Sequence, residues 1–172
     1  MGRSEIRFHW ASSLVQVQPD SRILEIGCGA GLLIEKMAEH VESGKITGID
    51  KSSIQIKKAA QRNLVSIEQG KVQLIQTDFS KYNGPENVFD RVVAFNLNIF
   101  LRHTSEALQK VRSLISSTGQ FMLFYQFPYT VDISAADPLI YQLESHRFKV
   151  IRKSIKKLDA TPAFCIVAGR GK

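Results

Sequence analysis

The residues best suited to chemistry lie between positions 25 and 31, where an acid precedes three glycines in the pattern Glu-x-Gly-x-Gly-x-Gly. Gly27, Gly29 and Gly31 lack Cβ atoms, so the backbone can turn sharply there and let a ligand lie against it. The run that follows predicts a helix over residues 32–41, and its first amide groups point toward the same place. Glu25 and the glycines therefore predict a loop that binds a small ligand.

The spacing of the glycines narrows the class of ligand. A dinucleotide-binding loop has the pattern Gly-x-Gly-x-x-Gly, but Leu32 or Ile34 occupies the last glycine position, depending on where the count begins. A phosphate-binding Walker loop is excluded because no Lys-Ser/Thr pair follows the glycines. The pattern instead favours a nucleoside ligand without a pyrophosphate.

Two further acids close runs that predict strands. Asp50 ends the run 46–50 and lies 19 residues beyond Gly31, and Asp78 lies near the end of the run 72–79. A carboxylate at the tip of the second strand can accept hydrogen bonds from both ribose hydroxyls. An ordinary helix cap is the alternative for Asp50, and a backbone cap is an equal alternative for Glu25.

Taken in order, these strand ends resemble the class I S-adenosylmethionine-dependent methyltransferases over roughly residues 20–127. The resemblance implies S-adenosyl-L-methionine as cofactor and S-adenosyl-L-homocysteine as product. It places Asp78 by the adenine amino group and Phe79 beside the base. The cofactor-binding residues that it implies are Glu25, Gly27, Cys28, Gly29, Gly31, Asp50, Lys51, Asp78, Phe79 and Asn96.

The acceptor side of the expected site is less defined. Trp10, Asn98 and Tyr129 are the candidate substrate contacts, and no catalytic residue is assigned. Core packing is the alternative for Trp10, and it is the one we favour. The stretch 96–99 departs from the Asn-Pro-Pro-Tyr pattern that orients an exocyclic amine of a base, and no Pro-Cys pair is present for attack on a pyrimidine. Both features argue against these two kinds of base methylation.

The end of the chain predicts an antiparallel hairpin. Two extended runs, 148–158 and 162–168, are separated by three residues, a gap in which no helix fits. The expected fold is therefore α/β, with a doubly wound, mostly parallel seven-stranded sheet that ends in this hairpin. We expect a single methyltransferase domain over residues 1–172, in which residues 1–18 form a helix over the site.

Composition sets outer limits on the class of protein. The chain is 44% hydrophobic, which predicts a full core, and no apolar run approaches the length of a membrane span. The two cysteines form neither a disulfide framework nor a metal-binding pattern, so no metal is expected. Cys28 is better interpreted as a small residue in a tight turn than as a nucleophile. Together with the lack of a signal-peptide pattern, these features favour a cytoplasmic protein.

The net charge of +7 lies entirely in the last part of the chain, because residues 147–172 carry eight Lys/Arg and one Asp. One interpretation is a contact surface for RNA. The other is an exposed edge strand that lysines protect from aggregation. We favour the second because no aromatic residues alternate with the cations to stack on bases.

These features predict a methyltransferase that acts on a small-molecule acceptor, without a membrane partner. The alternatives are an RNA methyltransferase that uses the basic hairpin, and a non-catalytic, cofactor-binding partner subunit. The acceptor atom and the oligomeric state are left open by the sequence.

Overall fold

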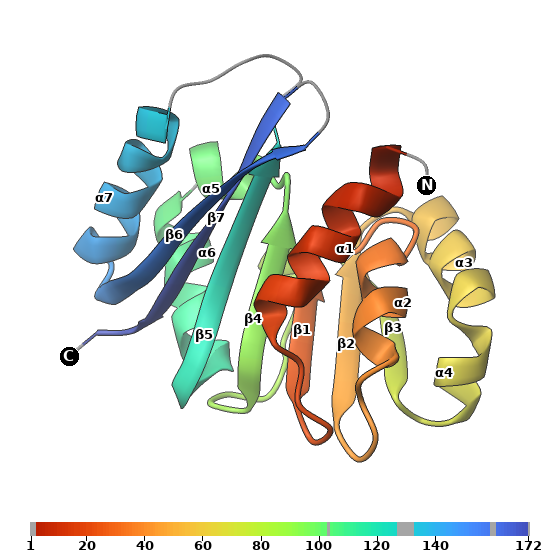
Figure 1. Ribbon diagram of the computed structural model, residues 1–172. Helices are drawn as coiled ribbons and strands as arrows, with labels where there is room; N and C mark the ends of the chain where they lie inside the picture. Colours follow the sequence, from red (N-terminus) through yellow and green to blue (C-terminus); the bar gives the residue numbers. More distant parts are fainter. Residues whose placement is uncertain (1–2, 103, 127–132, 159–160, 172) are drawn as a thin grey trace.

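The computed structural model describes residues 3–102, 104–126, 133–158 and 161–171 (Figure 1). A seven-stranded sheet runs through it in the order β3-β2-β1-β4-β5-β7-β6. Strands β1 to β5 are parallel, and β7 pairs antiparallel with both β5 and β6. The predicted fold class is therefore confirmed. The strands are β1 Arg22–Ile26, β2 Lys45–Asp50, β3 Val72–Gln76, β4 Phe89–Phe95, β5 Ile115–Gln126, β6 Phe148–Leu158 and β7 Thr161–Arg170.

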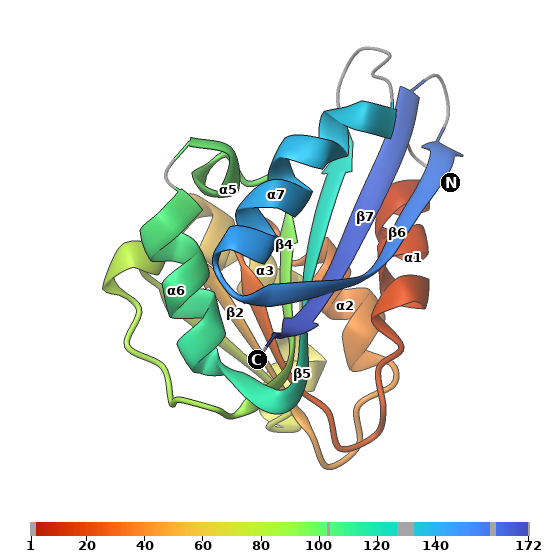
Figure 2. The same cartoon turned by 90° about the vertical axis from the view of Figure 1, so that its left-hand side faces the viewer.

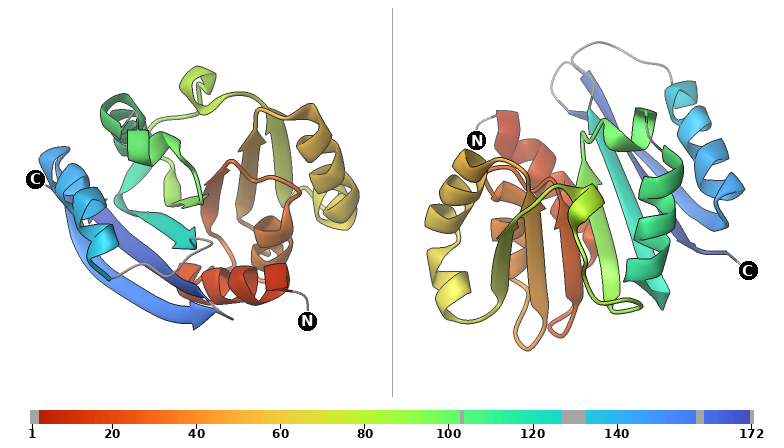
Figure 3. Two further views of the ribbon diagram at one scale, coloured as in Figure 1. Left: turned by 90° about the horizontal axis from the view of Figure 1, so that it is seen from above. Right: turned by 180° about the vertical axis from the view of Figure 1, so that it is seen from behind.

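Helices cover the two faces of the sheet unequally (Figure 3). One face packs against α1 Arg3–Val15, α2 Leu32–Ala38, α3 Ser53–Arg62 and α4 Leu64–Glu68. The other face packs against α5 Ile99–Arg102, α6 Thr104–Leu114, α7 Asp137–Ser145 and the 3₁₀ turns η1 Phe79–Lys81 and η2 Ile133–Ala136. Each face has its own apolar cluster, as expected for parallel strands that are buried on both sides.

The first helix is held across the middle of the sheet. The Trp10 ring of α1 lies edge-on to the Phe124 ring of β5, with 5.7 Å between centroids. At the end of α1 the Arg91 Nε of β4 donates to the Val15 carbonyl at 3.2 Å. These contacts fix α1 across β4 and β5, and its first turns lie toward the carboxyl ends of these strands, where Phe8 packs against Phe95.

The helices differ from the predicted segments in their bounds. The helix expected over 32–41 ends at Ala38, and the next helical region is divided at Asn63 into α3 and α4. The division has a physical cause, because the buried Asn63 side chain donates to the Gly31 and Ala59 carbonyls at 3.1 and 2.9 Å. Asn63 thereby ties the end of α3 to the glycine loop.

The C-terminal hairpin matches the prediction. Strand β7 is buried over its central residues 163–168, whereas β6 forms the outer edge of the sheet (Figure 2). Most of the cations of β6 are exposed, and Lys153 pairs with Asp137 of α7 at 3.0 Å. None of the described helices is both long and apolar enough to cross a bilayer.

Candidate functional site

Two adjoining hollows lie beyond the carboxyl ends of β1, β2 and β4, where an open α/β sheet binds its ligands. Pocket A, of about 340 Å³, is bounded by Arg7, Phe8, Glu25 and the glycine loop. Pocket B, of about 310 Å³, is bounded by Lys51, Asp78, Phe79 and residues 96–99. Gly27, Asp50 and Asn96 line both pockets. The two hollows therefore meet at the glycine loop.

The glycine loop turns through three left-handed residues. Gly27, Gly29 and Gly31 have φ values of +69°, +53° and +73°. A Cβ at Gly31 would lie 2.6 Å from Asn63 Nδ2, whereas one at Gly29 would meet no atom within 4 Å. A Cβ at Gly27 would lie 2.7 Å from Leu97 Cδ2, so the loop's path depends on glycine for conformation at all three positions and for space at Gly27 and Gly31.

Asp50 joins the glycine loop to the end of β2. Its Oδ2 accepts a hydrogen bond from the Gly29 amide at 2.9 Å, and its Oδ1 accepts one from the Ser52 amide at 2.8 Å. The N-cap of α3 is Ser52, whose Oγ accepts from the Gln55 amide, so Asp50 is not the cap. Each carboxylate oxygen has a second lone pair and so retains capacity to accept a further hydrogen bond.

Glu25 is buried at the floor of pocket A, with 2% of its surface exposed. Its Oε2 has no hydrogen-bond partner among the described residues, so the alternative of a backbone cap is not observed. Burial, and secondarily the nearby Asp50 carboxylate, raises the pKa of Glu25 well above its ordinary value. A buried polar atom without a partner marks a place where a ligand can donate a hydrogen bond.

Arg7 and Phe8 of α1 line pocket A, and the sequence did not identify either residue. The Arg7 guanidinium lies 4.8 Å from the Phe8 ring centroid and 5.6 Å from that of Phe95. Its Nε is buried without a hydrogen-bond partner among the described residues, and burial lowers the pKa of Arg7. Pocket A therefore combines a cation with a buried acid.

Pocket B brings together the remaining predicted residues of the second and third strand ends. Asp78 Oδ1 accepts hydrogen bonds from the Ser80 amide and hydroxyl at 2.9 and 2.8 Å, which lower the pKa of Asp78. Phe79 is 6% exposed and forms an apolar wall. Lys51 and Asn98 are exposed at the mouth of this pocket.

The Asn96 side chain joins the end of β4 to the end of β5. Its Oδ1 accepts from the Gln126 amide at 2.8 Å, and its Nδ2 donates to the Gln126 carbonyl at 3.3 Å. Its φ of +53° is one that asparagine adopts more readily than most residues. Asn96 thus borders both pockets while its amide serves the backbone.

Three further predicted site residues are Trp10, Cys28 and Tyr129. Trp10 is buried in the core against Phe124 and lines neither pocket, so packing accounts for it. Cys28 is buried in the turn, and burial raises the pKa of its thiol. A buried thiol that stays protonated packs the turn and does not act as a nucleophile. Tyr129 lies outside the described residues. The described residues include no group of three His, Cys, Asp or Glu side chains that could hold a metal ion.

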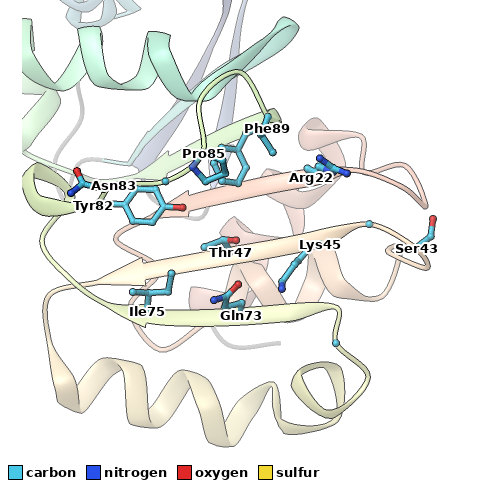
Figure 4. Close-up of a pocket in the computed structure, with 14 residues that line it drawn as sticks. Arg22, Ser43, Lys45, Thr47, Gln73, Ile75, Tyr82, Asn83, Pro85 and Phe89 are labelled. Carbon is cyan, nitrogen blue, oxygen red and sulfur yellow. The ribbon is translucent and has the colours of Figure 1, made fainter.

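A larger groove of about 550 Å³ lies elsewhere on the molecule (Figure 4). It runs along the sheet face of β1, β2 and β3 and reaches their amino ends, and Arg22, Lys45 and Gln73 are among the residues that line it. No residue of the glycine loop and neither Asp50 nor Asp78 borders it. Size alone therefore does not identify the site in this fold.

The raised pKa of Glu25 predicts a pH dependence of stability. The stability that protonated Glu25 contributes is fully present below pH 4.5, the ordinary pKa of the group. It is lost as the pH rises through the raised pKa of the folded state. A Glu25→Gln variant lacks this loss, so its free energy of unfolding should exceed that of the parent by a margin that grows as the pH rises above 4.5. Urea unfolding across this range measures the difference. Glu42→Gln, at an exposed position, is the control, and parallel profiles for the parent and Glu25→Gln would contradict the assignment.

The first comparisons are with sequence relatives. Cycloartenol-C-24-methyltransferase of Arabidopsis thaliana is 29% identical over 86 residues, 50% of this chain and 25% of that protein. Pavine N-methyltransferase of Thalictrum flavum subsp. glaucum is 29% identical over 104 residues, 60% of this chain and 29% of that protein. The chain thus spans between a quarter and a third of the length of these two curated relatives.

Solved structures share the fold over nearly the whole chain. A SAM-dependent methyltransferase from Aquifex aeolicus superposes with a TM-score of 0.77 at 15% identity, covering 98% of both chains. The [4+2]-cyclase SpnF superposes with a TM-score of 0.79 at 14% identity, covering 96% of this chain and 81% of that chain. Since a cyclase shares the fold, these likenesses establish architecture and not activity.

The family follows from a match that includes the site itself. The model of a family described as "Methyltransferase domain" matches residues 23–119, which contain the glycine loop, Asp50, Asp78 and Asn96. This match covers more than half of the chain, and the chain therefore belongs to the methyltransferase domain family.

Proposed function

We propose that this chain is a methyltransferase that uses S-adenosyl-L-methionine and transfers its methyl group to a small-molecule acceptor. The observation that carries the proposal is the meeting of pockets A and B at Gly27 and Asp50. One pocket offers a cation and a buried acid, and the other offers acids and an apolar wall. A nucleoside joined to a charged amino acid needs both environments side by side.

The residues present fit the two halves of this cofactor. In pocket A, Arg7 would hold the carboxylate of the amino acid part, and the unpartnered Glu25 would accept from its ammonium group. In pocket B, the free acceptor capacity of Asp50 suits the ribose hydroxyls, and Phe79 suits the adenine face. The glycine loop lets the ligand pass between the pockets without a Cβ in its way.

The chain's own residues would act mainly by position and environment. The bound cofactor supplies an activated methyl group, so the protein's task is to align the acceptor with it and to exclude water. Phe8 and Phe95 give pocket A aromatic walls. Such walls suit a sulfonium, whose positive charge disperses during transfer.

Arg7 provides a sharp test of how the ligand is oriented. Arg7→Ala should weaken the binding of S-adenosylhomocysteine about 10- to 150-fold, because one charge-assisted hydrogen bond is worth about 1.5–3 kcal/mol. Binding of 5′-methylthioadenosine, which lacks the amino acid part, should stay unchanged. Calorimetry with both ligands measures this. An equal loss for both, or none for either, would remove Arg7 from the carboxylate site.

The small-molecule acceptor is supported by the relatives, whose names specify cycloartenol and pavine. The test is a panel of small acceptors assayed for S-adenosylhomocysteine production. Turnover of a member of the panel supports the proposal. Cofactor binding without turnover of any acceptor would favour a non-catalytic partner subunit instead.

RNA is the second acceptor class, and the exposed cations of β6 are the observation that favours it. If RNA binds, replacing Lys156 and Lys157 by alanine should weaken the affinity and lower its dependence on salt. Lys57 and Lys58, an equally exposed pair on α3, are the matched control. Absence of RNA binding at low salt would eliminate this alternative.

A further inference from the structure

The groove of Figure 4 lies on a sheet face that no described helix covers. From behind, the connection from β3 to β4 crosses in front of β1, β2 and β3 as a short 3₁₀ turn and an irregular run (Figure 3, right). Thr47 and Gln73 form part of the floor, and Tyr82 and Pro85 of that connection form a wall. The volume of about 550 Å³ is in the range that small ligands occupy.

One end of the groove is positively charged. Arg22 of β1 and Lys45 of β2 are direct register partners, so their backbones lie about 4.8 Å apart. Both side chains are exposed, and neither forms an ion pair with a described residue. The neighbouring acid, Asp90, accepts a hydrogen bond from the Arg22 main-chain amide through Oδ2. Like charges directly opposite each other on a sheet are destabilising, and a bound anion would offset that cost.

The middle of the groove offers hydroxyl groups that the protein leaves unused. Tyr82 and Thr47 are each 7% exposed, and neither hydroxyl bonds to a described residue. In Figure 4 the Tyr82 hydroxyl points into the groove. A largely buried tyrosine hydroxyl ordinarily has a partner.

Gly84 keeps Tyr82 in this position. A Cβ at Gly84 would lie 2.5 Å from the Tyr82 ring, so the ring packs closely under the glycine. The Tyr82 hydroxyl is protonated at neutral pH and can donate a hydrogen bond, and burial raises its pKa further. The wall of the groove is thus built around a hydroxyl that faces the open space.

We infer that this groove is a second ligand site, separate from pockets A and B, for a small anion that carries hydroxyl groups. Arg22 and Lys45 bind the phosphate or carboxylate group, and the hydroxyls of Tyr82 and Thr47 bond to the body of the ligand. The side-chain amide of Gln73, between the cations and Tyr82, adds a donor and an acceptor. No carboxylate lines the groove, which agrees with an anionic occupant.

The test uses the full ¹⁵N-labelled chain titrated with glucose 6-phosphate, glucuronate and glucose, followed by NMR. Glucose 6-phosphate or glucuronate should shift the amide signals of residues 22, 45, 47 and 73. The ligand that binds more tightly shows whether the site prefers a phosphate or a carboxylate. Neutral glucose should bind at least tenfold more weakly. Equal shifts with glucose, or no shifts with any of the three up to about 10 mM, would overturn the inference.

Variants distinguish binding in the groove from unspecific attraction of anions to surface cations. The double variant Arg22→Ala with Lys45→Ala should lose the binding, and Thr47→Val, which keeps the side-chain shape, should weaken it several-fold. Lys149→Ala, at an exposed position on the opposite edge of the sheet, is the matched control. The NMR spectrum of each variant reports whether it is folded. Unchanged binding in a folded double variant would refute the site.

Discussion

Replacement of Asp50 by alanine is expected to weaken the binding of S-adenosylhomocysteine by more than tenfold. Two charge-assisted hydrogen bonds to ribose hydroxyls would be lost, each worth about 1.5–3 kcal/mol. The change also releases the Gly29 and Ser52 amides, which Asp50 now holds at 2.9 and 2.8 Å. The loss of affinity therefore combines a missing ligand contact with a loosened loop. Calorimetric titration of the folded variant measures it.

Two further variants interpret that result. Asp50→Asn keeps one acceptor oxygen and should bind with intermediate affinity. Asp20→Ala changes an exposed acid that lines neither pocket and should bind as the parent does. Parental affinity in a folded Asp50→Ala chain would show that this carboxylate does not hold the ribose.

Gly31→Ala is expected to cost about 2–5 kcal/mol of stability, the second large effect. A left-handed φ costs a residue with a Cβ about 1–2 kcal/mol, and overpacking adds about 1–3 kcal/mol. The clash is with fixed atoms, since the new Cβ would lie 2.6 Å from Asn63 Nδ2 and 3.2 Å from the Ala59 backbone. Urea unfolding gives the free energy of unfolding directly.

Gly29→Ala is the matched control, because Gly29 shares the left-handed conformation but has open space at its Cβ. It should cost only the conformational part, about 1–2 kcal/mol. An equal loss for both variants would mean that the contact with Asn63 and α3 is not what restricts position 31 to glycine.

The sheet and the glycine loop were predictable because they depend on local pattern. The glycines at positions 27, 29 and 31 restrict the backbone, and the acids at 50 and 78 close runs whose composition predicts strands. The three-residue gap between the last two extended runs left room for a hairpin alone. Each of these signals is contained within a few neighbouring residues.

Features that depend on contacts distant in sequence were not predictable. Arg7 reaches pocket A only because α1 crosses β4 and β5, a placement set by the Trp10–Phe124 and Arg91–Val15 contacts. The sequence left Trp10 open between a substrate contact and core packing, and its contact with Phe124 decides for the core. The break at Asn63 depends on a carbonyl 32 residues away. The groove exists because no helix covers the face of three strands.

The central claim, that pockets A and B together hold one adenosyl amino acid, is tested most directly by a crystal structure of the chain grown with S-adenosylhomocysteine. The amino acid part should lie in pocket A, between Arg7 and Glu25, and the ribose should lie within hydrogen-bonding distance of Asp50. A ligand bound away from the glycine loop, or an Asp50 side chain turned away from the ribose, would contradict it.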